Sequence, residues 1–209
     1  FRYFIPSSLE RLCYAGGILP NMKKSFLAKL QLPFLIATAF FSLWKVAKKE
    51  CPDIIHAHWI IPLGFVAAVV GKCLNIPVVV TAHGYVLPFD NALFRVLPRF
   101  ATKSAAAITV NSSFTKSAVA KISNLPCIKV IPMGVDMKLF SSSLPSAAAV
   151  IRKKFGITGK SGKMILFVGR LAERKGVTYL IAAMKGVAKR FPGCKLVVGG
   201  EGPEKPALI

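Results

Sequence analysis

The hydrophobic positions of this chain gather into six short continuous runs that predict β-strands. These runs cover residues 53–58, 77–84, 106–111, 128–132, 164–169 and 195–200. They are rich in Ile and Val and largely uninterrupted by polar residues, which is typical of strands buried on both faces of a sheet. Mixed apolar and basic patterns predict helices over 25–49, 64–74, 113–123, 146–155 and 177–191. Strands separated by helices at this spacing predict an α/β fold with parallel sheets.

A change of composition after the fourth run divides the chain. Gly134, the serine run 141–143 and Pro145 follow a predicted strand, and such residues interrupt regular structure. We therefore expect a first domain over 1–132, a linker over 133–146 and a second domain over 147–209. Both domains look incomplete, because the first lacks opening strands and the second stops after two. A chain that begins with Phe rather than Met also indicates a fragment of a longer protein.

Composition excludes several classes of protein. The mean hydropathy is +0.55, which is too high for a disordered chain. The 29 Lys and Arg residues against 8 Asp and Glu give a net charge of +21, shared almost evenly between 1–132 (+11) and 133–209 (+10). Such an excess suits nucleic acid, an anionic membrane surface or phosphorylated substrates, and charge alone does not choose among them.

Five widely spaced cysteines without a C-x-x-C motif favour buried free thiols in a reducing compartment.

One apolar segment raises the question of a membrane. Residues 30–44 form a run of 15 residues without a charge, whereas a bilayer span needs about 20. A core or interfacial helix is therefore favoured over a transmembrane one. No charged region leads into an apolar stretch with a small-residue cleavage site, so we identify no signal peptide.

The turn after the fifth predicted strand offers a site for an anion. Gly169 ends that strand, and Lys175 and Gly176 lead into the helix at 177. Glycine allows close approach of a ligand, and a helix start presents free N–H groups and the positive end of its dipole. Arg170 and Lys175 bracket this turn and could together hold a diphosphate. A solvated basic turn explains the same spacing equally well.

A second glycine-rich segment follows the sixth predicted strand. Gly200, Glu201 and Gly202 stand there before Pro203, but no register completes the dinucleotide fingerprint G-x-G-x-x-G. Either a plain tight turn or a loop that approaches a nucleotide accounts for this segment.

The three histidines all lie at ends of predicted strands. His56 and His58 share one face of a strand and could chelate a metal if a third ligand arrived, but we find no convincing third ligand. For His56 we expect a hydrogen-bonded core histidine. His83 stands at the carboxyl end of its strand before Gly84, which makes it the better candidate to touch a substrate. The sequence contains no G-x-S-x-G, P-loop or H-E-x-x-H motif.

Six segments together carry a family resemblance. They are 53–58 (DIIHAH), 81–84 (TAHG), 111–116 (NSSFTK), 131–136 (IPMGVD), 167–176 (FVGRLAERKG) and 200–203 (GEGP). Each is weak alone, but in this order and at compatible spacing they resemble the retaining glycosyltransferases of family four, which have the GT-B fold. That resemblance implies two Rossmann-like parallel-sheet domains facing across a cleft, with an acceptor side in 1–132 and nucleotide-sugar binding beginning in 147–209.

The resemblance also implies roles for individual residues. Arg170 and Lys175 would bind the donor diphosphate, and Gly169 would lie beside it. Gly200, Glu201 and Gly202 would line the nucleotide side of the cleft. His83 would lie near the transferred sugar and is the catalytic candidate. Gly134 and Asp136 would belong to the hinge, and no metal or other cofactor would be needed.

Two departures from the family pattern bear on activity. The Glu-x7-Glu element would lie beyond Ile209, and the Gly-rich loop of the first strand would precede Phe1. We therefore expect a glycosyltransferase that moves a sugar from a nucleotide-diphosphate sugar to a glycan or lipid-linked acceptor, with this chain inactive by itself. Its location would be cytoplasmic and peripheral to an anionic membrane surface. The alternative is a basic nucleic-acid-binding or scaffolding protein, supported by charge alone.

Overall fold

The computed structural model describes residues 3, 9–13, 18–84, 92–122, 127–140, 145–157 and 162–209. The chain divides into two compact units, Phe1–Gly134 and Val135–Ile209, and each is treated by itself below. The boundary lies close to the predicted start of the linker. Beside it, Asp136 accepts hydrogen bonds from the backbone N–H groups of Lys138 (2.9 Å) and Leu139 (3.2 Å).

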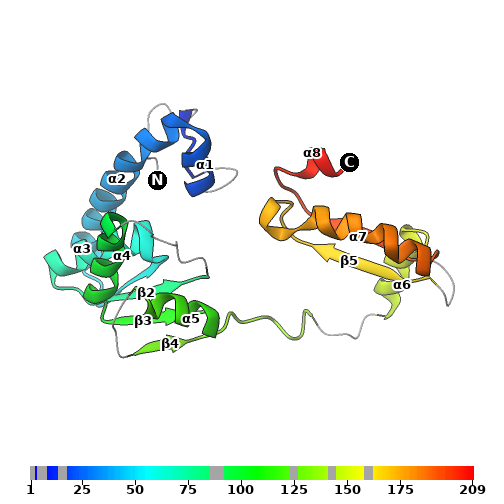
Figure 1. Cartoon of the computed structure of the whole chain (residues 1–209). Coiled ribbons are helices and arrows are strands. Elements are labelled where there is room, and N and C mark those ends of the chain that lie inside the picture. Colours follow the sequence, from blue (N-terminus) through cyan, green and yellow to red (C-terminus); the bar gives the residue numbers. More distant parts are fainter. Residues whose placement is uncertain are drawn as a thin grey trace. The chain divides into compact units, whose positions relative to one another are not determined.

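The first unit is built on a four-stranded parallel sheet. The strands are β1 (Ile55–His58), β2 (Val78–Ala82), β3 (Ala107–Val110) and β4 (Ile128–Val130). They lie in the order β1-β2-β3-β4 (Figure 1). In this register, His58 pairs with Thr81 and Thr81 pairs with Thr109. The predicted parallel strands are therefore confirmed in this unit.

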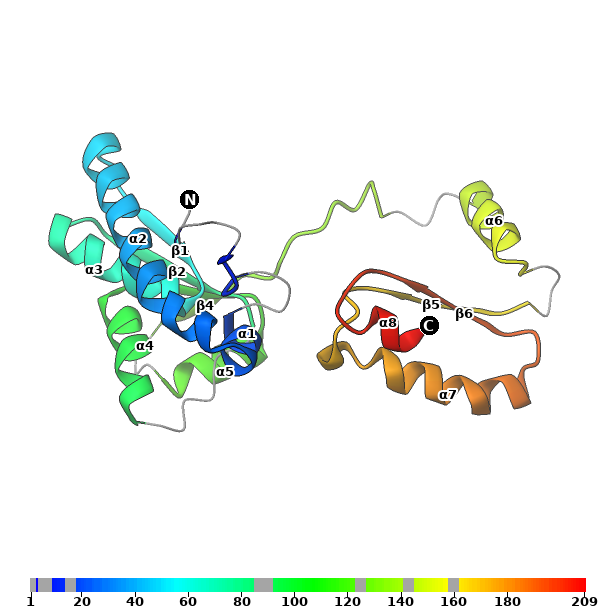
Figure 2. The same ribbon diagram turned by 90° about the horizontal axis from the view of Figure 1, so that it is seen from above.

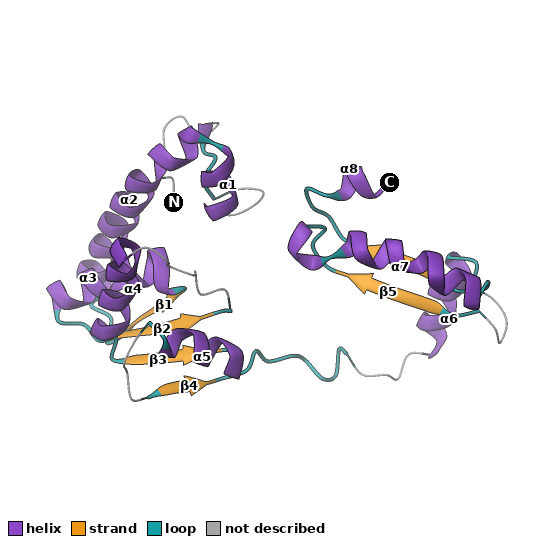
Figure 3. Cartoon of the chain, in the orientation of Figure 1, coloured by secondary structure: helices purple, strands orange, loops and turns teal. Residues whose placement is uncertain are grey.

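Two helices precede β1 and the others connect the strands, as Figure 3 shows. They are α1 (Ile18–Lys24), α2 (Phe26–Glu50), the π-helical turn η2 (Ile60–Gly64), α3 (Phe65–Leu74), α4 (Ala92–Ser104) and α5 (Ser113–Ala120). Ser112 caps α5, because its hydroxyl accepts a hydrogen bond from the N–H of Thr115 (3.2 Å). Ser25 caps α2 in the same way. The helices expected over 25–49, 64–74 and 113–123 are confirmed, whereas α1 and α4 were not predicted.

The core of the first unit lies on one face of the sheet. Side chains such as Ile55, Val80 and Ile108 point to this face and pack against residues from all of α2, α3, α4 and α5. On the opposite face, His56, His58 and Lys129 are exposed. The expectation of strands buried on both faces is therefore wrong for the described residues, because the connecting helices all pack on the same side.

A buried glutamine holds the N-terminal segment on α2. Gln31 is fully buried. Its Oε1 accepts from the N–H groups of Arg11 (2.9 Å) and Leu12 (3.2 Å), and its Nε2 donates to the carbonyl of Leu9 (2.7 Å). This polar anchor lets Leu12 pack against Ala28 and Leu35 in a small separate cluster.

The second unit has two parallel strands, β5 (Met164–Val168) and β6 (Lys195–Gly199). Its helices are α6 (Pro145–Lys154), the 3-10 turn η3 (Glu173–Lys175), α7 (Val177–Arg190) and α8 (Lys205–Leu208). Figure 2 shows α7 running alongside the strands. The predicted helices over 146–155 and 177–191 and both predicted strands are confirmed.

The five cysteines are unpaired. The expected burial is wrong, since Cys13, Cys51, Cys73 and Cys127 are exposed and Cys194 is half-buried. Partial burial of the Cys13 thiol nevertheless raises its pKa above the usual value; a hydrogen bond from Tyr3 opposes that shift and the Glu10 carboxylate adds to it. A thiol with a raised pKa carries less of the reactive thiolate at neutral pH.

Candidate functional site

Two loops at the carboxyl ends of β5 and β6 lie against each other. The N–H of Gly169 donates to the carbonyl of Gly199 (3.0 Å), and the N–H of Leu171 donates to the carbonyl of Glu201 (2.9 Å). These bonds continue the strand pairing beyond both strands. The segments that the sequence singled out separately, 169–175 and 200–202, are thus brought together at one edge of the sheet.

Two glycines allow this contact. A Cβ atom at Gly200 would lie 1.9 Å from the carbonyl oxygen of Gly169, and one at Gly202 would lie 2.0 Å from that of Leu171. Gly200 also has a φ of 153°, which glycine tolerates and other residues rarely adopt. The glycines therefore serve the close approach of two backbones, which gives the second glycine-rich segment a structural reason independent of any ligand.

The two cations of the predicted anion site lie next to this contact. Arg170 follows Gly169 directly, and Lys175 ends η3; both side chains are exposed. Gly176 adopts a left-handed conformation (φ 67°) and begins α7. Among the described residues, neither cation forms an ion pair, since the two ion pairs found there are Lys49–Glu50 and Lys205–Glu201. Arg170 and Lys175 are therefore available to an anion at the start of a 14-residue helix.

The acidic residues of these loops have different surroundings. Glu201 is exposed and its carboxylate accepts from the ammonium of Lys205 at 2.6 Å, so its side chain is already paired. Glu204 places one carboxylate oxygen in a buried position without a hydrogen-bond partner in the described part of the chain. The sequence gave no reason to single out Glu204.

In the first unit, two histidines meet where β1 and β2 end. The Nδ1 atom of His58 lies 2.6 Å from the Nε2 atom of His83, and their rings stack with centroids 4.9 Å apart. One ring must donate and the other accept, so this bond fixes the relative orientation of the two rings. His83 is half-buried and follows the last residue of β2. It is thus placed at the carboxyl end of its strand, as the sequence predicts.

His56 differs from its prediction. Its Nε2 lies 2.7 Å from the hydroxyl of Thr81, which in turn lies 2.5 Å from the hydroxyl of Thr109. The side chain is therefore hydrogen-bonded, but it is exposed rather than in the core, because the helices cover the other face of the sheet. Over the described ranges, no group of three or more His, Cys, Asp or Glu side chains is placed to hold a metal ion.

Trp59 is a neighbour of His83 that the sequence analysis did not single out. Its ring centroid lies 5.7 Å from that of His83, and its side chain is 43% exposed. The backbone has a φ of 72°, which is uncommon for a residue other than glycine. Two backbone hydrogen bonds hold Trp59 in this conformation. Its N–H donates to the carbonyl of Thr81 (2.8 Å), and its carbonyl accepts from the N–H of Gly64 (2.9 Å). Its position directly after His58 was the available signal.

Family profiles match both units. The profile described as Glycosyltransferase Family 4 matches residues 4–139, and the one described as Glycosyl transferases group 1 matches residues 149–209. The first covers more than half of the chain. These matches contain all the segments on which the resemblance rests.

Several relatives have similar sequences. TuaC of Bacillus subtilis, named for teichuronic acid biosynthesis, is 32% identical over 161 residues, which is 75% of this chain and 40% of TuaC. The alpha-monoglucosyldiacylglycerol synthase of Acholeplasma laidlawii is 27% identical over 175 residues, 75% of this chain and 43% of that protein. The 2-deoxystreptamine glucosyltransferase of Streptomyces kanamyceticus is 26% identical over 187 residues, with coverages of 81% and 47%. The chain spans less than half the length of these relatives.

Solved structures share the fold. The crystal structure of Anabaena HepE in complex with UDP has a TM-score of 0.60 at 20% identity, and the match covers 87% of this chain and 55% of HepE. TarM has a TM-score of 0.55 at 15% identity, with coverages of 83% and 32%. The predicted fold class, Rossmann-like parallel-sheet units of the GT-B type, is confirmed.

Proposed function

Because this chain belongs to Glycosyltransferase Family 4, we propose that it is the part of a glycosyltransferase that contributes donor-binding loops and His83. The donor is a nucleotide-diphosphate sugar, and the transfer retains the configuration at the sugar's anomeric carbon. The observation that carries this proposal is the pair of cations, Arg170 and Lys175, without carboxylate partners among the described residues and beside two interlocked loops. Charge alone supported the nucleic-acid alternative, and no nucleic-acid partner is proposed.

The two cations act where negative charge develops. When the bond between the anomeric carbon and the diphosphate oxygen breaks, its electron pair stays on the diphosphate. The guanidinium of Arg170 offers two parallel N–H donors, and Lys175 offers a mobile point charge. Groups already oriented toward that charge stabilise the transition state more than the ground state, and removal of one such group typically costs about 3 kcal/mol.

The loop glycines give this site its shape. Gly169 and the segment Gly200–Glu201–Gly202 place backbone atoms, rather than side chains, beside the diphosphate and the nucleotide. Glu201 contributes through its carbonyl, which accepts from Leu171, while its carboxylate stays paired with Lys205. In this proposal the loop backbones therefore shape the site, while the side chains of Arg170 and Lys175 hold the diphosphate.

His83 contacts the transferred sugar in this proposal. Its Nε2 is held by His58, which leaves Nδ1 to hydrogen-bond a sugar hydroxyl. The acceptor hydroxyl forms the new bond to the anomeric carbon and gives its proton to the departing diphosphate oxygen. The proposed acceptor is a glycan or a lipid-linked molecule in cell-wall or polysaccharide synthesis. The proposed location is the cytoplasm, at a membrane surface. Transfer needs no divalent metal or other cofactor in this proposal.

Calorimetric titration of this chain with UDP, GDP and ADP tests the donor site. We expect saturable binding of one nucleoside diphosphate, unchanged by EDTA. Arg170→Ala should weaken it about 10- to 100-fold, as expected for loss of hydrogen bonds between charged groups. Lys189→Ala removes the same charge near the far end of α7 and serves as the matched control. Equal effects of the two substitutions would show that only overall charge matters and would refute the assigned site.

A second experiment tests His83 in the whole protein. His83→Ala should lower kcat while nucleoside diphosphate affinity is kept, because His83 is assigned to the sugar. His56→Ala is the control, since His56 is exposed on the same sheet face and bonds to Thr81 instead. Wild-type kcat in His83→Ala would remove His83 from the mechanism.

A further inference from the structure

One side of α2 exposes a row of large apolar side chains. Phe26, Leu30, Phe34 and Phe41 are 74%, 50%, 53% and 67% exposed. Their spacing of four and seven residues places them on one face of a helix. We call these four residues the apolar stripe. Together they leave roughly 490 Å² in contact with water, taking about 200 Å² for each whole residue. That area is in the range of the largest apolar patches on monomeric proteins, which are often functional.

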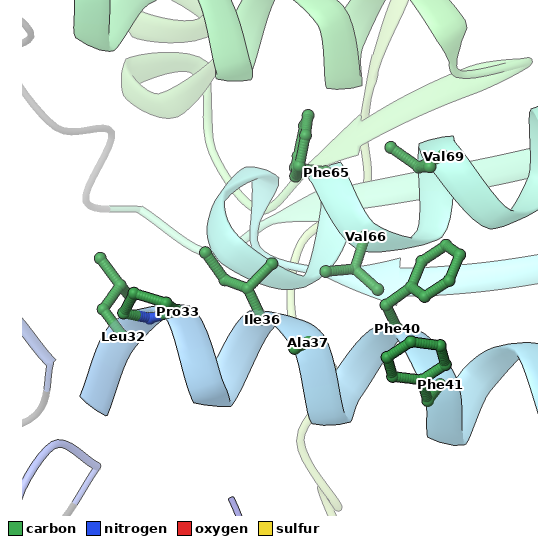
Figure 4. Close-up of a pocket in the computed structure, with 9 residues that line it drawn as sticks. All are labelled: Leu32, Pro33, Ile36, Ala37, Phe40, Phe41, Phe65, Val66 and Val69. Atoms are coloured by element: carbon green, nitrogen blue, oxygen red, sulfur yellow. The ribbon is translucent and has the colours of Figure 1, made fainter. Parts of the chain in front are cut away.

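A groove adjoins this stripe. Between α2 and α3 lies a hollow of about 520 Å³ that is lined by apolar residues alone. Figure 4 shows Ile36 and Phe40 of α2 facing Phe65 and Val66 of α3 across it, with Phe41 at its edge. Its volume is typical of a small-molecule site, but it has no polar group to orient a polar ligand. The lining therefore suits a hydrocarbon chain.

Lysines surround both features. Lys29 lies one helical turn before Pro33 of the groove, Lys45 lies one turn after Phe41, and Lys72 lies one turn after Val69; all three are exposed. Lys48 continues the stripe and lies 5.2 Å from the ring of Trp44. Over residues 18–84 the sequence has seven lysines against two acidic residues. Cations that flank an apolar helical face favour the surface of an anionic membrane.

We propose that α2 docks this protein on an anionic bilayer, with the apolar stripe in the interface and one acyl chain of an anionic lipid in the groove. The lysines then contact lipid headgroups while the phenylalanines enter the hydrocarbon boundary. The inference rests on the proposed membrane attachment and assigns its residues. The groove would also give a protein with lipid-linked acceptors a binding site for an acyl chain.

Two observations favour a bilayer over the other occupants of such a face. A second copy of the chain packed symmetrically on this stripe would place Lys45 and Lys48 of both copies in one interface, where like charges oppose association. A membrane span is disfavoured by contacts of α2 within the unit. By length and composition α2 could cross a membrane, but Phe40, Leu43 and Trp44 pack on the core and Leu35 packs on the N-terminal segment.

Vesicle co-sedimentation tests the proposal with the chain as it exists. Vesicles of phosphatidylcholine alone are compared with vesicles containing 30% phosphatidylglycerol. We expect strong preference for the anionic vesicles and loss of that preference in high salt. Phe34→Ser with Phe41→Ser should lower partitioning at least tenfold. Phe114→Ser is the matched control, because Phe114 is 82% exposed but lies on α5.

The lysines have their own pair of variants. Lys45→Gln with Lys48→Gln should weaken binding about 25-fold, since each basic residue near an anionic surface contributes about a fivefold factor. Lys116→Gln with Lys121→Gln removes the same charge from the exposed side of α5 and its end. Equal loss in both pairs would mean that binding depends on overall charge and would overturn the docking surface.

The groove needs a test that separates it from the stripe. Ala37 is exposed and lines the groove. Ala37→Leu adds apolar area to the docking face but fills part of the groove. If the groove takes an acyl chain, this variant binds anionic vesicles more weakly than wild type. Equal or stronger binding would overturn the acyl-chain site.

Controls separate the outcomes from failure of the proposed transferase. Each variant should keep wild-type circular dichroism and nucleoside diphosphate affinity, because the variants lie in the first unit and the donor loops in the second. Vesicle binding without nucleoside diphosphate binding would retain the docking surface and count against the transferase. Concentration-dependent dimers that the stripe variants abolish, without vesicle binding, would overturn the lipid assignment.

Discussion

Gly202→Ala is a substitution for which the structure predicts a large loss of stability in the second unit. Its Cβ would lie 2.0 Å from the carbonyl oxygen of Leu171 and 2.6 Å from the carbonyl carbon, whereas non-bonded atoms normally keep about 3.5 Å. The loop would therefore have to move by more than 1 Å. Two backbone hydrogen bonds of Leu171 lie at that contact. Its N–H donates to the carbonyl of Glu201 (2.9 Å), and its carbonyl accepts from the N–H of Glu204 (3.1 Å).

The expected cost follows from these contacts. Loss of two backbone hydrogen bonds costs about 2 kcal/mol, and residual crowding adds about 1–3 kcal/mol. Gly186→Ala is the matched control, because Gly186 lies inside α7 with nothing within 4 Å of its Cβ position. Alanine is favoured over glycine in a helix, so this control should stabilise the second unit by about 1 kcal/mol.

Urea unfolding with two signals measures both effects. Trp44 and Trp59, the two tryptophans of the chain, lie in the first unit, so fluorescence follows that unit. Hydrogen exchange of peptides covering β5 and β6 follows the second unit, and far-UV circular dichroism follows both units together. Gly202→Ala should lower the second unit's free energy of unfolding by about 3–5 kcal/mol and leave the fluorescence transition unchanged. A change below about 0.5 kcal/mol, the usual limit for neutral surface substitutions, would refute the close approach of the loops.

Three further substitutions or reactions test the first unit. Ser112→Ala should lower its stability by about 1 kcal/mol, read from tryptophan fluorescence in urea, because the cap of α5 is lost; Ser113→Ala should not, since Ser113 lies inside the helix. Gln31→Leu should lower the free energy of unfolding by at least about 2–3 kcal/mol, because it leaves buried backbone groups without partners. Proteolysis of the segment before α2 should then be faster than in wild type. Cleavage at the wild-type rate would show that Gln31 does not hold this segment. Cys13 should react with iodoacetamide more slowly at pH 8 than free cysteine does and gain rate as pH rises further, because its raised pKa delays thiolate formation. A faster reaction at pH 8 would contradict the raised pKa.

The sequence predicted the elements that have a strong pattern and missed those defined by packing. The six predicted strands are continuous apolar runs, and most helices follow from mixed apolar and basic patterns between them. α4 was missed because Pro98 interrupts its pattern, although that proline is fully buried in the fold. The exposed face of the first unit's sheet was not predicted, because a run of apolar residues does not show on which side of the sheet the helices pack.

The candidate site shows the same division. Gly200 and Gly202 stand out in the sequence, but their reason, contact with the carbonyls of Gly169 and Leu171, requires the register of β5 and β6. The bond between His58 and His83 joins residues 25 positions apart and depends on the pairing of β1 with β2. Residue type and spacing therefore singled out these residues, while sheet register determined which of them meet. The roles of Arg170, Lys175 and His83 stay predictions for the experiments above.

The strand order of the first unit has a consequence for how the chain folds. Each strand of the β1-β2-β3-β4 sheet pairs with the strand that precedes or follows it in the sequence, so no strand must wait for a distant partner. Pairing between strands that are neighbours in the chain costs less entropy than pairing with strands further away in the sequence. As the chain leaves the ribosome, each new helix and strand can add to an edge that is already formed. This sheet is therefore suited to assembly during synthesis, one strand at a time.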